Sequence, residues 1–435
     1  MIGSAANIES SSSAAAQNDI STSILKLTNP EIEALETEAR SSTQNVALLM
    51  KGLSFLSKVD VLYENVQKVM SRINLGGYPS TVFTPLLPQT DDPGLVVHII
   101  EDINTIYPSM TQETLAEIFN QQYASGGENS IQHPGRWVLL NSYMAMLLQW
   151  KVANSHRQDF ATLEWAFLKN AYCVFSDVII RGKDLLSCQG LVFLMMAMQG
   201  NADVWTSYHV LSAAARLAQF LGLNRRSVGK AIPTVEDEQS FHTFWLIYIL
   251  DVSEALKSGL SPCIPLSEVC SELPDETPTD GIGCVSVTGM DRPLNVFSCR
   301  AKLAVIQAKI HQELFSELAL QQSAADRFVA AETLHNDLEA WKNSLAFEIR
   351  PFSEDTAPDD LEPQIILLHF TYYSCIWKVV AAKKRLHSGH SSTNEDSQNS
   401  QSDNGARVPM ACIDAARGTI RLLRYMDAES FTFLW

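Results

Sequence analysis

The feature of this sequence that most restricts its fold is the recurrence of apolar residues at three- and four-residue spacing along most of the chain. Such spacing places apolar side chains on one face of a helix, whereas a half-buried strand requires strict alternation. The sequence contains no convincing strand pair and no short-period repeat. It therefore predicts an all-α protein. The strongest expected helices cover residues 95–106, 112–122, 136–152, 162–180, 295–320, 324–344 and 364–386.

The apolar content is large enough for a sizeable core. Hydrophobic residues make up 46% of the 435 residues and charged residues only 19%, which excludes a mainly disordered chain. A single core rarely grows beyond about 250–300 residues, but packed helices can extend further as one body. We therefore expect a large array of antiparallel helical hairpins that forms one body over residues 76–435, with its core at residues 185–274.

Several polar segments are expected to lie outside this core. Residues 1–29 are rich in Ser, Ala and Asn without periodicity, which predicts a disordered tail. Residues 30–75 have the spacing of an amphipathic helical lead-in. Residues 275–292 are expected to form a loop, and the low-complexity residues 387–407 a disordered insertion.

Net charge and apolar run length exclude two kinds of partner. The formal net charge of −17 repels phosphate, so direct DNA binding by this chain is not expected. There is no signal-peptide pattern at the N-terminus, and the apolar runs near residues 137–150 and 191–198 are shorter than the roughly 18–20 residues of a membrane span. The sequence thus predicts a soluble, intracellular protein with no membrane partner.

The segment from Trp205 to Pro274 contains the clearest helix signals. Apolar residues on more than one face of its first helix predict burial almost all round. Gly222 is positioned to end that helix in the left-handed conformation, with Leu223 folding back as its apolar partner. Thr234 is expected to cap the next helix, which begins with an acidic first turn.

Two charged residues lie inside these apolar helices. Arg216 is the lone charge in the first, and Asp251 has the same place in the second, after the expected core run from Phe244 to Leu250. A buried charge has to be paired, so each is expected to have a partner, for which the other is one candidate. For Arg216 a contact with a ligand is the alternative.

The order and spacing of residues in this segment resemble a known family. Arg216 lies within Ala-Ala-Arg-Leu-Ala, and Glu238 lies seven residues before Trp245, which forms a pair with Phe244. The residues that carry the resemblance, and for which we expect structural roles, are Arg216, Gly222, Leu223, Glu238, Phe244, Trp245, Asp251, Gly259, Pro262, Ile264 and Pro274. They resemble the fungal-specific transcription factor domain, the middle homology region of fungal zinc-cluster transcription factors.

The sequence also departs from the family. Ser240, Phe241, His242 and Val252 stand where members usually carry arginine, so an ion network built on those arginines is not expected here. The family's DNA reader is an N-terminal cluster of six cysteines around two zinc ions, yet residues 1–100 contain no cysteine. Zinc is therefore expected only if a preceding cluster exists.

The chain is expected to be truncated at its C-terminus, because residue 435 falls inside a segment with the pattern of a helix.

The resemblance implies a transcription regulator that controls metabolic genes, with this chain as its effector-sensing middle domain. It implies action in the nucleus, and the cytoplasm is the alternative location. The implied partners are a second copy of the chain or a full-length relative, in a dimer, and the transcription machinery or a coactivator. A small-molecule effector is also implied. The alternative is a small-molecule-binding or enzymatic protein that reuses the helical fold, and a pure scaffold is a third option.

The sequence contains no enzyme template. The sequence has neither GxSxG nor HExxH, and no catalytic, cofactor-binding or metal-binding residues are predicted. The eight cysteines include no CxxC pair, which favours free thiols. His387 and His390 lie in the polar insertion, which favours a solvated loop over a metal site. The methionines at positions 195, 196 and 198 are expected to fill the core or to line an apolar effector site.

Overall fold

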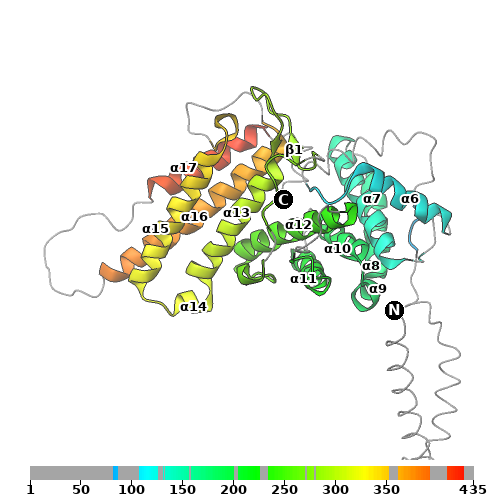
Figure 1. Cartoon of the computed structure of the whole chain (residues 1–435), viewed down its shortest axis with the longest axis horizontal. Coiled ribbons are helices and arrows are strands. Elements are labelled where there is room, and N and C mark those ends of the chain that lie inside the picture. The colour runs from blue at the N-terminus through cyan, green and yellow to red at the C-terminus, as the bar shows by residue number, and fades with distance from the viewer. Residues whose placement is uncertain are drawn as a thin grey trace, which may run out of the picture. The chain divides into compact units, whose positions relative to one another are not determined.

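A computed structural model describes residues 82–86, 107–125, 131, 133–155, 158–199, 204–225, 234–269, 272–278, 281–351, 361–391 and 409–425. All of them belong to the compact unit Tyr78–Trp435. Over these residues the fold is mostly helical, which confirms the predicted class (Figure 1). The expected tail at 1–29, the lead-in at 30–75 and the helix at 95–106 lie outside the described residues.

The helices fall into two groups, each with its own apolar cluster. The first group is α6 (Gln112–Ala124), α7 (Pro134–Ser155), α8 (Gln158–Cys173), α9 (Phe175–Arg181), α10 (Leu185–Gln199), α11 (Val204–Phe220) and α12 (Val235–Ser258). The second is α13 (Val296–Ile310), α14 (Glu317–Leu320), α15 (Ala324–Ser344), α16 (Pro363–Ser391) and α17 (Met410–Leu422). The groups meet where α12 packs on α13, and α13 contributes side chains to both clusters.

Helix α10 lies at the centre of the first group, between α7 and α11. It is apolar on all sides, and every residue from Ser187 to Met198 is buried. The side chains of Met195, Met196 and Met198 are at most 5% exposed and belong to the first cluster. Of the two predictions made for these methionines, the structure therefore favours the filling of the core.

Helix α10 begins at a polar contact. The side-chain oxygen Oδ1 of Asp184 accepts a hydrogen bond from the backbone N–H of Ser187 at 2.7 Å. Its other oxygen lies 3.2 Å from Nε2 of His133, just before α7. The hydrogen bond from His133 is the largest cause that lowers the pKa of Asp184, to about 2. Asp184 therefore caps α10 and links it to the start of α7.

This contact predicts a pH-dependent effect on stability. A carboxylate whose pKa falls on folding stabilises the fold above its ordinary pKa near 4, and the effect disappears as the pH falls towards 2. Asn is also a good capping residue, so Asp184→Asn removes the charge but keeps the cap. Because Asp184 is about half exposed, we expect this variant to lose only about 0.5–1 kcal/mol at pH 6. Urea unfolding from pH 6 to pH 3 tests this, and a loss that is constant over that range would contradict it.

The structure corrects the expectation that residues 275–292 form only a loop. Cys284–Val285 (β1) pairs antiparallel with Leu294–Asn295 (β2), with Cys284 opposite Asn295. Strands of two residues are too short to produce an alternating pattern in the sequence. Asn295 then caps α13, because its Oδ1 accepts from the backbone N–H of Ser298 at 3.0 Å.

Two of the long predicted helices are interrupted. The helix expected at 162–180 is divided into α8 and α9 at Val174. The helix expected at 295–320 becomes α13, the π-helical turn His311–Phe315 and α14. The interruption lies at Ser316, whose backbone is extended (φ −68°, ψ 154°) and whose hydroxyl accepts from the N–H of Ala319 at 3.1 Å. Serine favours such caps because its side chain competes for backbone hydrogen bonds.

Two other helices of the second group fit the prediction better. Helix α15 has the predicted bounds. Helix α16 extends to Ser391, so the insertion expected at 387–407 begins with helical residues, and 392–407 lie outside the described residues. The stretch Pro363–Leu386 is long and apolar enough to cross a membrane by length and composition, but 61% of its most apolar window is buried. Because α16 packs on α13, α15 and α17, a central position in the core explains that composition.

Three short helical turns complete the described structure. The 3₁₀ turn η2 (Leu266–Glu268) follows α12, η4 (Phe347–Ile349) follows α15, and η5 (Leu423–Tyr425) continues α17.

Candidate functional site

The end of α11 has the geometry that its sequence predicts. Gly222 has a left-handed φ of 71°. Its N–H donates to the carbonyl of Gln219 at 3.1 Å, and the N–H of Leu223 donates to the carbonyl of Ala218 at 3.0 Å. These two bonds define a Schellman cap. The half-buried Leu223 packs against the first cluster.

The prediction that α11 is buried almost all round is wrong. Trp205, His209, Arg216 and Phe220 are exposed on one stripe of the helix, and Trp205 and Phe220 are 67% and 71% accessible. The guanidinium of Arg216 donates to Oε1 of Gln219 at 3.0 Å on this outer face. Arg216 is therefore not a buried charge, and the ion pair suggested between Arg216 and Asp251 is not present. The apolar residues on which the prediction rested, from Tyr208 to Leu221, are buried or half-buried, but they do not cover this outer stripe.

Helix α12 begins as predicted and has a buried centre. The hydroxyl of Thr234 accepts from the N–H of Asp237 at 3.2 Å, and the carboxylate of Asp237 accepts from the N–H of Thr234 at 2.9 Å. This is a capping box, and the half-buried Glu238 follows it. Every residue from Phe244 to Leu250 is buried, and Nε1 of Trp245 donates to the carbonyl of Glu272 at 2.9 Å.

The buried partner of Asp251 is a loop and not an arginine. Oδ1 of Asp251 accepts from the N–H of Cys263 at 3.1 Å, and Oδ2 from the N–H of Ile264 at 2.8 Å. Burial raises the pKa of Asp251, and these two backbone donors oppose that rise. The loop reaches this position because Gly259 ends α12 with a left-handed φ of 76°.

The remaining residues of the resemblance complete the same arrangement. Ile264 is fully buried in the first cluster and Pro262 is half-buried. The carbonyl of the buried Pro274 accepts from the hydroxyl of Ser298 on α13 at 2.7 Å. The contacts of the motif residues from Phe244 to Pro274 thus connect α12, the segment that follows it and α13.

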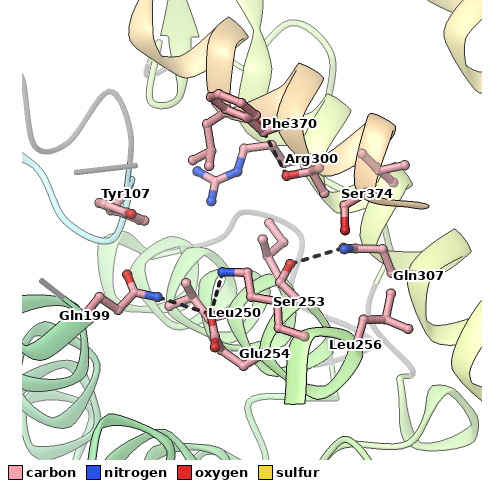
Figure 2. Close-up of a pocket in the computed structure, with 15 residues that line it drawn as sticks. Tyr107, Gln199, Leu250, Ser253, Glu254, Leu256, Arg300, Gln307, Phe370 and Ser374 are labelled. Carbon is pink, nitrogen blue, oxygen red and sulfur yellow. Dashed lines mark hydrogen bonds and ion pairs between the residues drawn. The ribbon is translucent and has the colours of Figure 1, made fainter. Parts of the chain in front are cut away.

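A cavity lies where α12, α13 and α16 meet (Figure 2). Its volume is about 220 Å³. Ser253 and Glu254 of α12, Arg300 and Gln307 of α13, and Phe370 of α16 line it. Tyr107, Gln199, Lys257, Thr371 and Ser374 complete the polar part of the wall. The cavity is therefore bounded by both helix groups.

The polar groups of the cavity are already linked across its walls. Glu254 accepts from Nζ of Lys257 at 2.9 Å and from Nε2 of Gln199 at 3.4 Å. The hydroxyl of Ser253 donates to Oε1 of Gln307 at 3.2 Å, which connects α12 to α13 (Figure 2).

Arg300 is the buried charge of this site. It is 9% exposed, and its guanidinium carbon lies 5.5 Å from the centroid of the Tyr107 ring. Burial lowers the pKa of Arg300 and raises that of Tyr107, and the positive charge of Arg300 opposes the rise at Tyr107. A guanidinium stays charged in proteins even when its pKa falls. The cavity thus contains a permanent, largely desolvated cation.

Sequence reasoning predicted none of the cavity residues. Its walls come from positions as far apart as Tyr107 and Ser374, and local spacing contains no information on such contacts. One signal was present, because Arg300 lies on the apolar stripe of its helix with Phe297 and Ala304. Among the described residues there is also no group of three or more His, Cys, Asp or Glu side chains placed to hold a metal ion.

Comparison with known proteins identifies the family. The sequence pattern of the fungal specific transcription factor domain matches residues 100–343, which is more than half of the chain. The chain belongs to this family. The family consists of transcription factors and not of enzymes, which confirms the prediction that this chain is not an enzyme. The matched range includes the motif on α11 and α12. It also includes α13, so two of the three helices around the cavity lie within the matched range, and α16 lies outside it.

Curated relatives agree with this assignment. The chain is 29% identical over 363 residues to an ABC-transporter-regulating transcription factor of Aspergillus oryzae, and 28% identical to one of the same description in Aspergillus fumigatus. Each match covers 81% of this chain but 40% of the relative. The Fusaridione A cluster transcription factor fsdR of Fusarium heterosporum is 24% identical over 82% of this chain and 66% of its own length. No solved structure matches this fungal transcription factor domain.

Proposed function

We propose that this chain is the effector-sensing regulatory domain of a zinc-cluster-type transcription factor that controls metabolic genes. The observation that carries the proposal is the cavity between the two helix groups, because a molecule bound there would contact α12, α13 and α16 together. The Aspergillus relatives regulate ABC transporters, and fsdR belongs to a Fusaridione A cluster. We therefore propose transporter or secondary-metabolite genes as targets.

The charge and composition of the chain bear on DNA and zinc, and the other partners in this proposal follow from the family resemblance. A net charge of −17 disfavours binding to DNA by this segment. Zinc and direct DNA contacts enter this proposal only if an N-terminal cysteine cluster exists, since residues 1–100 contain no cysteine. We further propose that the domain acts in the nucleus, in a homodimer or a heterodimer with a full-length relative, and contacts a coactivator.

A reporter assay in a fungal host tests the regulatory role. The full chain is fused to a bacterial DNA-binding protein, and transcription from a promoter with that protein's binding sites is measured. We expect the fusion to change reporter output at least several-fold relative to the DNA-binding protein alone. As control, Asp337→Ala removes a carboxylate from a surface pair 3.4 Å from Lys309 and should not change the output. A nuclear, intact fusion that leaves the reporter at the level of the DNA-binding protein alone would overturn the proposal.

A further inference from the structure

We propose that the outer stripe of α11 binds a second copy of this chain, so that the two α11 helices pack antiparallel across a two-fold axis. The outer stripe consists of the exposed residues Trp205, His209, Arg216 and Phe220. This inference rests on the proposed function, since it names the surface of the dimer that the regulator would form. Helix α11 packs on α10 and α12 and lies at the lower edge of the first group in Figure 1.

The two ends of the outer stripe are highly exposed aromatic rings. The side chains of Trp205 and Phe220 are 67% and 71% exposed, and among the aromatic side chains that the structure describes only Phe347, at 69%, is comparable. Arg216 is held on the same face, where it donates to Oε1 of Gln219 at 3.0 Å. Aromatic residues and arginine are the types enriched at protein interfaces. The stripe therefore has the composition of a contact surface.

The order of residue types along the stripe is the same in both directions. An aromatic ring stands at each end, and a nitrogen-bearing side chain lies four residues inward from it, since His209 follows Trp205 and Arg216 precedes Phe220. A two-fold axis brings the same surface of two copies together. It would place Trp205 of one copy opposite Phe220 of the second, and Arg216 opposite His209.

The centre of the stripe permits a close approach of two helices. Ser212 and Ala213 lie midway between its ends, and both are small and half-buried. Packed helices are about 8–10 Å apart, according to the side chains at the contact, so small residues at the crossing allow the shorter distance. The hydroxyl of Ser212 already donates to the carbonyl of Tyr208 at 2.9 Å, so its burial between two copies would leave no unpaired donor.

The charge of α11 is compatible with a second copy. Two chains with a net charge of −17 repel each other, so they meet at the lowest electrostatic cost where carboxylates are absent. Helix α11 contains no Asp or Glu, and Arg216 is its only Arg or Lys. In the antiparallel pair this guanidinium would lie within one turn of Trp205 of the second copy, and a cation packs favourably on an indole ring.

The exposed area indicates how strong the dimer would be. An aromatic side chain buries about 150–250 Å² when fully covered, so four rings that are each about 70% exposed offer roughly 400–700 Å². Stable interfaces bury about 1,200–2,000 Å² in total. The rest of the stripe adds to the area of the rings, but we expect a weak dimer that dissociates on dilution.

Sedimentation velocity of the purified full chain over a hundredfold range of micromolar concentrations tests this inference. We expect a monomer–dimer equilibrium that added salt strengthens, because screening reduces the repulsion between two acidic chains. Phe220→Asp should weaken association at least tenfold. Phe347→Asp changes an equally exposed ring outside the stripe and should leave association unchanged. Circular dichroism shows whether both variants fold, as exposed positions predict.

Crosslinking tests the antiparallel arrangement separately. A photoreactive p-benzoylphenylalanine in place of His209, in a mixture of unlabelled and isotope-labelled chains, should give crosslinks between copies to the segment around Arg216. The inference is overturned if the chain stays monomeric, if Phe220→Asp associates like the wild type, if Phe347→Asp weakens association equally, or if the crosslinks join other elements. A monomeric chain that still changes reporter output would overturn this surface alone, and the proposed regulatory role would stand.

Discussion

Replacing Asp251 with alanine is expected to lower the free energy of unfolding by about 2–6 kcal/mol, because each of two buried N–H groups left without an acceptor costs about 1–3 kcal/mol. Asp251 is 1% exposed and accepts the N–H groups of Cys263 and Ile264. Alanine would leave both donors buried without an acceptor and would release the loop that inserts Ile264 into the core. Urea unfolding followed by circular dichroism measures the change.

Two further variants show whether the hydrogen bonds cause this loss. Asp251→Asn keeps the size of the side chain and one acceptor oxygen, so we expect a smaller loss of about 1–3 kcal/mol. Asp337→Ala also removes a carboxylate, but from a half-exposed pair between α15 and Lys309 of α13, and should cost at most about 1 kcal/mol. If Asp251→Ala were no more destabilising than Asp337→Ala, the loop would not depend on this carboxylate.

A methyl group at Gly190 is expected to destabilise the protein by about 1–3 kcal/mol. This is opposite in sign to the usual effect, since alanine is favoured over glycine inside a helix by about 1 kcal/mol. A Cβ atom at Gly190 would lie 2.8 Å from the carbonyl oxygen of Gly135, so α7 and α10 would have to move apart. Because the obstacle is backbone, no side-chain rotation can relieve it. Chemical denaturation of Gly190→Ala and Gly190→Val tests this, and the larger residue should cost more.

Gly222 provides the matched control. A Cβ atom there would have no atom within 4 Å, but the φ of 71° is unfavourable for other residues. Gly222→Ala should therefore cost about 1–2 kcal/mol through backbone strain alone, and Gly222→Asn should cost less, since Asn tolerates this conformation. If Gly190→Ala were stabilising, the close approach of α7 and α10 would not limit the packing.

The sequence was sufficient to predict those features that depend on neighbouring residues. The caps at Thr234 and Gly222 form as predicted, because each uses hydrogen bonds between residues at most five positions apart. The bounds of α15 match because Ser323 and the helical spacing are local signals too. The divisions of the predicted helices at Val174 and Ser316 show the limit of periodicity, since apolar spacing continues across a short interruption.

The sequence by itself determined the helical class, the main helices and the family, because helical periodicity, caps and motif spacing can be recognised within short stretches of the chain. Only the tertiary structure decided which charges are buried. It placed Arg216 on the surface, gave Asp251 a loop as its partner, and brought Tyr107, Arg300 and Ser374 to one cavity. The physical reason is that burial and the pairing of charges depend on which helix faces meet, and that is fixed by packing between residues far apart in the chain.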